Sequence, residues 1–86
     1  MTTISSKKFK KASKKLSKEM KSTLKERLKM FVENPFHPIL NNHALQGSMR
    51  HYRSINITGD YRVIYEKIGD NLSRLMDVDT HSNLYR

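Results

Sequence analysis

The sequence contains no cysteine and no tryptophan, and it has only three glycines in 86 residues. Without thiols the chain forms no disulfide and no thiolate metal site, a composition typical of a reducing compartment. Three scattered glycines leave no glycine-rich loop that could cradle the phosphates of a nucleotide cofactor. No apolar run approaches the ~20 residues of a transmembrane helix, and no apolar core of a secretion signal follows Met1. We therefore expect a cytoplasmic protein with no membrane partner and no small-molecule cofactor.

Acidic residues are also scarce, with eight against 17 lysines and arginines, so that the formal net charge at pH 7 is +9. Eleven of the basic residues lie in residues 1–43, which hold only three acids. A positive field of this strength attracts phosphates and acidic proteins. The sequence predicts an RNA-binding basic surface made of Lys10, Lys14, Lys18, Lys21, Lys25, Arg50 and Arg53.

Two amphipathic helices are predicted in the first half. Phe9, Ala12 and Leu16 recur at helical spacing, and either Ser5 or Ser6 can act as the N-cap. Ser17 can end this helix and cap a second one, which Asn34-Pro35 ends and whose apolar positions are Met20, Leu24, Leu28, Phe31 and Val32. Because the connection is so short, we expect an antiparallel helix hairpin whose apolar stripes cover another layer. Residues 2–4 precede it as an edge strand or a loose terminus.

The second half changes to the alternating pattern of strands. We expect strands at residues 51–58, 61–68 and 72–78, joined by turns at residues 58–60 and 69–71. In the third strand, Leu72, Met76 and Val78 should share one face, with Leu75 between them. Residues 34–43 form an irregular connector that Phe36, Ile39 and Leu40 should fix to the core. Helices followed by an antiparallel meander predict an α+β fold, and a chain this short predicts one domain over residues 1–86.

The two faces of the predicted sheet differ in chemistry. If the helices cover the face with Ile55, Ile57, Val63 and Tyr65, then Tyr52, Ser54, Asn56 and Arg62 lie on the open face. The planar guanidinium of Arg62 can bind a phosphate through two hydrogen bonds. It can equally be a half-exposed arginine that pairs with Glu66 or Asp77, and the sequence leaves both interpretations open.

Residues 80–86 concentrate reactive side chains directly after the last predicted strand, namely His81, Tyr85 and Arg86. His43 lies where the connector meets the sheet, a typical place for a functional side chain. Together these residue types can move protons, stack on a base and neutralise a phosphate without a metal. We expect no metal site, because no ligand spacing links His37, His43, His51 and His81.

Several of these residues resemble the RelE/ParE toxin superfamily in their order along nearly the whole chain. The specific combination is the His-x-Leu-x-Gly element His43-Ala44-Leu45-Gln46-Gly47 with the terminal element Thr80-His81-Ser82-Asn83-Leu84-Tyr85, and Gly59-Asp60-Tyr61-Arg62 also matches. The chain looks closest to the YafQ-like branch of ribosome-dependent messenger-RNA endonucleases. The resemblance implies the RelE-like microbial ribonuclease fold and the toxin of a type II toxin–antitoxin system, inhibited by an acidic cognate antitoxin. It also implies metal-independent cleavage of mRNA on the ribosome, leaving 2′,3′-cyclic phosphate and 5′-hydroxyl ends.

The resemblance extends to individual site residues. His43, Asp60, His81 and Tyr85 match YafQ-like active-site positions, and Arg62 matches the strand arginine of the RelE branch. Ser54 and Asn56 depart from it, because related enzymes place stronger acid–base groups on that strand. We therefore expect His81 to be the general acid, with His43 as candidate base. Arg62 then holds the phosphate, Asp60 orients a base or the nucleotide, and Tyr85 stacks or assists proton transfer.

Two other functions fit parts of the sequence. A ParE-like gyrase inhibitor would use the same scaffold as a binder and would not need paired histidines or the terminal tyrosine. A non-catalytic nucleic-acid-binding module would use the lysine-rich helices alone, with binding that falls steeply with salt.

Overall fold

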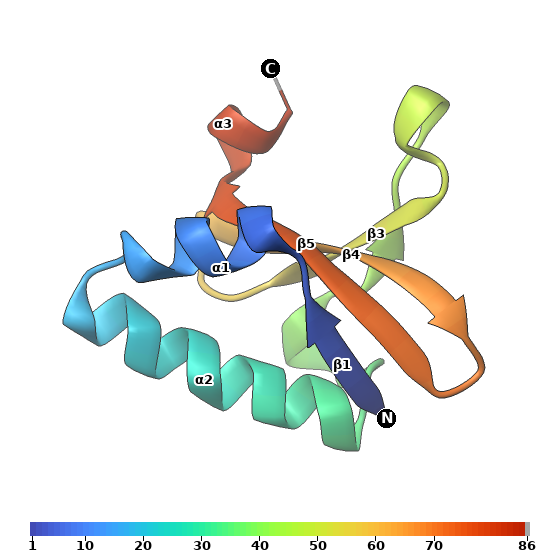
Figure 1. Cartoon of the computed structure of the whole chain (residues 1–86), viewed down its shortest axis with the longest axis horizontal. Helices are drawn as coiled ribbons and strands as arrows, with labels where there is room; N and C mark the ends of the chain where they lie inside the picture. The colour runs from blue at the N-terminus through green and yellow to red at the C-terminus, as the bar shows by residue number, and fades with distance from the viewer. Residues whose placement is uncertain (86) are drawn as a thin grey trace.

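The computed structural model describes residues 1–85, and Arg86, which the sequence placed in the reactive C-terminal segment, lies outside the described residues. Five strands form one sheet in the order β1-β5-β4-β3-β2 (Figure 1). The strands are β1 (Thr2–Ser5), β2 (His43–Ala44), β3 (Tyr52–Asn56), β4 (Tyr61–Gly69) and β5 (Leu72–Thr80). The helices are α1 (Lys7–Lys14), α2 (Lys18–Glu33) and α3 (His81–Leu84), with short 3₁₀ turns η1 (Pro38–Leu40) and η2 (Gly47–Met49). The α+β class is confirmed, and none of the described helices has the length and apolarity needed to cross a bilayer.

The N-terminal strand corrects two parts of the predicted architecture. β1 precedes the helices and pairs with β5 in parallel, from Thr2 opposite Leu72 to Ser5 opposite Leu75. The sheet is therefore mixed, and the prediction of a purely antiparallel sheet was wrong. The predicted N-terminal helix hairpin is not confirmed as a separate opening unit, because the chain first enters the sheet and α1 then lies along β5 (Figure 1). Residues 2–4 proved to be an edge strand.

α1 and α2 both begin directly after a serine that the sequence predicts as an N-cap. The Ser6 side chain accepts a hydrogen bond from the Phe9 amide at 3.0 Å, and the Ser17 side chain accepts one from the Met20 amide at 3.1 Å. Each cap satisfies an amide that has no partner inside its helix. α2 ends at Glu33, directly before Asn34-Pro35, as expected for a ring that cannot donate the next hydrogen bond.

The core lies between α2 and the sheet. It contains Phe9, Leu24, Phe31, Leu40, Ile55, Ile57, Val63, Tyr65, Leu75 and Val78, all at most 5% exposed. The rings of Phe31 and Tyr65 meet edge to face with centroids 4.7 Å apart. The connector is fixed to this core by Leu40 and by Asn42, whose side chain donates to the Tyr65 hydroxyl at 2.7 Å, whereas Phe36 is 66% and Ile39 51% exposed. The prediction that these two side chains also pack into the core was wrong, since the single 3₁₀ turn of η1 buries only one of its apolar side chains.

An irregularity in β5 changes which of its residues face the core. Ile64 lies opposite Asp77, but Tyr65 lies opposite Leu75, so Met76 is an extra residue on β5. Such a bulge reverses the alternation beyond it. Leu75 and Val78 are therefore both buried, whereas Met76 is only half-buried, and the predicted shared face of Leu72, Met76 and Val78 was wrong.

Candidate active site

Two rows of mostly polar residues cross the open face of the sheet. In the first row His43, Ser54, Ile64 and Asp77 are neighbours across β2, β3, β4 and β5. In the second row Asn56, Arg62 and Asp79 are neighbours. Residues opposite one another on paired strands point to the same face. The face with Ile55 and Val63 is buried in the core, so the predicted division of the sheet into a packed and an open face is confirmed.

The C-terminal helix places an imidazole beside a phenol. The His81 and Tyr85 rings lie one helical turn apart, with centroids 4.6 Å apart and planes inclined by 53°. The Thr80 side chain caps the helix by accepting a hydrogen bond from the Asn83 amide at 3.3 Å. The backbone N–H of His81 donates to the Asp60 carbonyl at 2.8 Å, which ties α3 to the β3–β4 turn. The structure thus brings together three of the residues that the sequence singled out.

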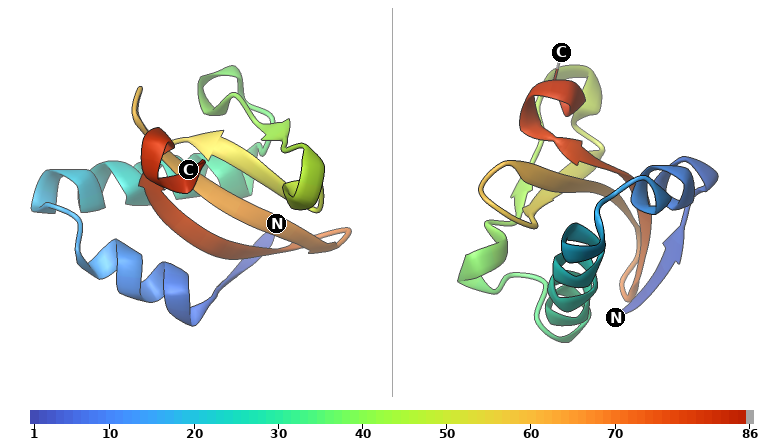
Figure 2. Two further views of the ribbon diagram at one scale, coloured as in Figure 1. Left: turned by 90° about the horizontal axis from the view of Figure 1, so that it is seen from above. Right: turned by 90° about the vertical axis from the view of Figure 1, so that its left-hand side faces the viewer.

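A groove lies on the open face between α3 and the segment containing η2. Figure 1 shows α3 in red and the η2 segment in yellow-green on one side of the sheet, with α2 on the other, and Figure 2 looks onto this side in its left panel. The groove has a volume of about 260 Å³ and is lined by Lys8, Met49, Tyr52, Ile64, Met76, Asp77, Asn83 and Leu84. Most of these side chains are apolar or aromatic, and the ionised groups among them, Lys8 and Asp77, form an ion pair at 3.4 Å.

Unpartnered polar atoms gather at the same face. Among the described residues, the buried side-chain oxygens and nitrogens without a hydrogen-bond partner are Ser54 Oγ, Asn56 Oδ1 and Tyr85 Oη. All three belong to the predicted site or to the positions where the sequence departs from related enzymes. Folding alone selects against such groups, because each costs roughly 1–3 kcal/mol when left unsatisfied. Ser54 is fully buried, so it stands beneath the surface that a substrate could touch.

Arg62 is held by the turn that precedes it. Its Nη1 donates to the carbonyls of Thr58, Gly59 and Tyr61 at 3.1, 2.9 and 3.3 Å. Neither Glu66 nor Asp77 is its partner, since these acids pair with Arg74 and Lys8. Its Nε and Nη2 make no hydrogen bond to the described residues, so an anchored guanidinium keeps donors for another acceptor.

His43 lies on the edge strand β2, whereas α3 follows β5 on the other side of β3 and β4. Its exposed ring places Nδ1 2.8 Å from the Asn41 carbonyl, and this contact is a hydrogen bond when Nδ1 carries the proton. Nε2 is then the acceptor that a general base requires. Two strands separate β2 from β5, which places their backbones about 14 Å apart at the usual strand spacing. His43 and His81 therefore flank the open face without touching.

The predicted RNA-binding residues fall into two groups. The five lysines are exposed on α1 and α2, and Arg50 is exposed after η2. Lys14, Lys21 and Lys25 line one shallow groove between the two helices. Arg53 differs, because its Nε donates to Asn42 Oδ1 at 2.8 Å and its guanidinium lies 5.4 Å from the Phe36 ring centroid. These contacts give Arg53 a packing role that the sequence did not predict.

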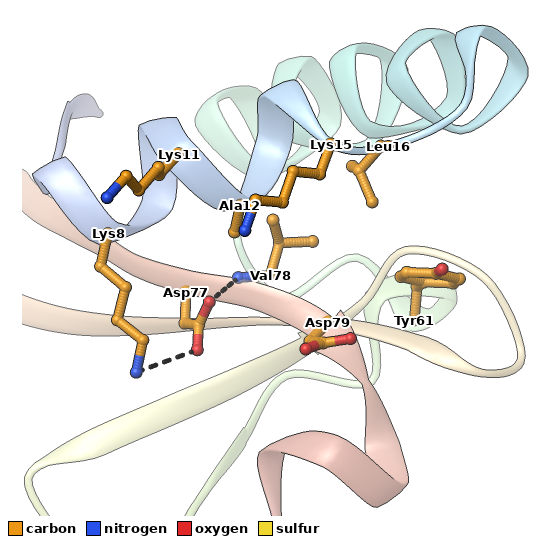
Figure 3. Close-up of a pocket in the computed structure, with 9 residues that line it drawn as sticks. All are labelled: Lys8, Lys11, Ala12, Lys15, Leu16, Tyr61, Asp77, Val78 and Asp79. Carbon is orange, nitrogen blue, oxygen red and sulfur yellow. Dashed lines mark hydrogen bonds and ion pairs between the residues drawn. The ribbon is translucent and has the colours of Figure 1, made fainter.

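Lys8 was not predicted as a residue of this face, and Asp77 was named only as an alternative partner of Arg62. Figure 3 shows Lys8 reaching from α1 to the Asp77 carboxylate, whose other oxygen accepts a hydrogen bond from the Val78 amide at 2.9 Å. The pocket drawn in Figure 3 is a second one, next to the groove described above. It has a volume of about 350 Å³, lies between α1 and the end of β5, and is also lined by Tyr61 and Asp79. Only the bulge in β5 turns Asp77 to the open face while keeping Leu75 in the core. Within residues 1–85 no three histidines or acids lie close enough to hold a metal ion.

Comparisons with known proteins connect this geometry to a family. No curated protein matches the chain. Among solved structures, YafQ from E. coli strain BL21(DE3) is 27% identical with a TM-score of 0.82, over 99% of this chain and 98% of that one. The toxin in an E. coli DinJ–YafQ toxin–antitoxin complex is 26% identical with a TM-score of 0.80, over 99% and 97%. A YoeB/ParE toxin from Agrobacterium tumefaciens, 18% identical with a TM-score of 0.78 over 94% and 99%, shares the fold. The family model "Bacterial toxin of type II toxin-antitoxin system, YafQ" matches residues 1–86, so the chain belongs to the YafQ family of bacterial toxins.

Proposed function

We propose that this toxin cleaves mRNA on the ribosome by a metal-independent reaction at the open face of its sheet. The observation that carries the proposal is the His81–Tyr85 ring pair, with centroids 4.6 Å apart on a short helix tied to the Asp60 carbonyl. Within residues 1–85, the phenol oxygen of this pair and two buried oxygens of the neighbouring sheet face, Ser54 Oγ and Asn56 Oδ1, have no hydrogen-bond partner. Packing alone explains neither the exposed ring nor the unpaired oxygens.

The proposed reaction uses the RNA itself as the nucleophile. A base removes the proton of the 2′-hydroxyl, the 2′-oxygen attacks the adjacent phosphorus, and the bond from phosphorus to the 5′-oxygen breaks. An acid protonates the leaving 5′-oxygen, so the products are a 2′,3′-cyclic phosphate and a 5′-hydroxyl. No external water or cofactor is needed to balance this step.

His81 is the proposed acid, and Tyr85 packs on its ring or assists the proton transfer. His43 is the proposed base, because Nε2 is its acceptor when Nδ1 donates to the Asn41 carbonyl. Arg62 stabilises the charge on the transition-state phosphate through the donors that the turn carbonyls leave free. Asp60 orients the nucleotide or a proton-transfer group from the turn that also anchors α3.

We further propose two macromolecular partners. The exposed lysines of α1 and α2 bind ribosomal RNA by charge, which places the open face towards the message. An acidic antitoxin is the second partner, because a chain of net charge +9 favours an acidic protein and a relative has been solved in a DinJ–YafQ complex. Co-expression with an acidic protein encoded beside the toxin gene should abolish toxicity and yield a complex on purification.

Mapping RNA 5′ ends after induction tests the activity. Cuts at defined codon positions in translated messages support the nuclease, whereas intact messages with stalled gyrase support a gyrase inhibitor. A message with a single 2′-deoxynucleotide at a mapped site provides the chemical test. Cleavage should disappear at that site and persist at an unmodified site in the same message. Continued cutting at the deoxynucleotide would refute the proposed nucleophile.

A further inference from the structure

The groove between α3 and η2 is distinct from the histidine positions and has its own chemistry. Its lining includes Met49 of η2, Tyr52 of β3 and Leu84 of α3, together with Ile64 and Met76 of the sheet. Ile64 is only 4% exposed, so it is part of the packed sheet. The volume of about 260 Å³ is below the roughly 300–1,000 Å³ of pockets for drug-sized ligands, so only a small ring system fits.

The polar lining restricts the ligand further. Lys8 lines the groove beside Asp77, with 3.4 Å between its Nζ and the carboxylate, and the Lys8 side chain is 77% exposed. The Asp77 side chain is only 19% exposed, so the pair is best kept, and the Lys8 ammonium can keep it because its three N–H donors allow it to contact a ligand anion at the same time. A small groove lined mainly by apolar and aromatic side chains, with one exposed cation, suits an aromatic ring that carries a phosphate.

We propose that this groove binds one unstacked nucleobase of RNA, with the base packed between Tyr52 and Leu84 and its phosphate facing Lys8. This subsite rests on the proposed function, since Leu84 is the last residue of α3, directly before Tyr85, and the bound nucleotide would adjoin the proposed scissile phosphate. Single-stranded RNA is recognised by bases that leave their stack and pack on aromatic side chains. Lys8 supplies the charge at this subsite, while Arg62 serves the reacting phosphate.

Mononucleotide titration of the full-length toxin, followed by NMR of the methionine methyl groups, tests this subsite. Adenosine 5′-monophosphate and cytidine 5′-monophosphate should shift the Met49 and Met76 signals saturably. Met1, Met20 and Met30 pack against the core and serve as internal controls that should not move. Ribose 5-phosphate, which lacks the base, should leave all five signals in place.

Two variants of one residue provide the matched comparison. Tyr52→Ala should weaken mononucleotide binding by about 5- to 150-fold, the range that corresponds to the roughly 1–3 kcal/mol of one stacked base. Tyr52→Phe keeps the ring and should bind like the wild type. Lys8→Ala should weaken binding of the monophosphates while leaving binding of the uncharged nucleosides unchanged.

Three outcomes would overturn the subsite: no shift at Met49 and Met76, equal shifts with ribose 5-phosphate, or equal binding by Tyr52→Ala with its fold verified. Ribosome-dependent cleavage by the same wild-type preparation separates the two proposals. Cleavage without mononucleotide binding refutes the subsite alone, and binding without cleavage refutes the proposed function alone.

Discussion

Replacement of His81 by alanine separates chemistry from folding. The His81 side chain is exposed, and its ring contacts Tyr85. Its structural link to the β3–β4 turn is a backbone hydrogen bond to the Asp60 carbonyl, which alanine retains. The Thr80 cap also remains. Loss of one ring contact should therefore lower the free energy of unfolding by less than about 1.5 kcal/mol.

The expected effect on cleavage is much larger. Removal of a general acid slows a reaction by about 10²–10⁴-fold, which corresponds to about 2.7–5.4 kcal/mol in the activation barrier. The assay is single-turnover cleavage of a defined message on purified translating ribosomes, quantified by primer extension, with urea unfolding of each variant in parallel. His51→Ala is the matched control, because His51 is another exposed histidine. A folded His81→Ala variant that cleaves at near the wild-type rate, or a His51→Ala variant that is equally slow, would refute the assignment.

Three further predictions concern stability and binding. Asn42→Ala should lower the free energy of unfolding by about 2–4 kcal/mol in urea denaturation, since its side chain donates to the buried Tyr65 hydroxyl at 2.7 Å and accepts from a guanidinium; a change below 1 kcal/mol would contradict the network. Ser17→Ala should cost about 0.5–2 kcal/mol through loss of the α2 cap, whereas Ser17→Asp should not, and equal loss in both would exclude capping as the cause. Lys21→Glu combined with Lys25→Glu should weaken ribosome sedimentation and flatten its salt dependence without slowing cleavage on saturating ribosomes, and a slowed saturated rate would place these lysines in the chemistry instead.

Local signals in the sequence were sufficient to predict helices α1 and α2 and to predict which face of the sheet packs against the core. Ser6 and Ser17 cap helices because a serine before an amphipathic run satisfies amides within three residues. Ile55 and Val63 face the core because strand alternation is read over a few positions. The reactive set around His81 was recognisable because its residue types are not needed for packing.

Features that depend on distant partners were not predictable in the same way. Four residues of β1 carry too little pattern to reveal a parallel partner at the other end of the chain. No residue near Met76 signals the bulge in the sequence. The faces of the β5 residues were therefore predicted wrongly, and the place of Asp77 on the open face was not predicted. Lys8 pairs with Asp77 because the bulge turns Asp77 to the open face. The Arg62 guanidinium is positioned by carbonyl groups of the preceding turn, and the sequence alone does not give their orientation.

The parallel pairing of β1 with β5 also separates completion of the sheet from assembly of the site during folding. Thr2 meets Leu72, so this contact closes a loop of 70 residues at an entropic cost of about 4 kcal/mol from chain length alone. β5 lies between β1 and β4, and α3 follows it without a linker. Contacts of such long range form slowly compared with helical turns. The His81–Tyr85 pair depends instead on contacts that are local in sequence, the antiparallel β4–β5 pairing and the hydrogen bond from His81 to the Asp60 carbonyl, so the helix that carries it can be positioned before β1 completes the sheet.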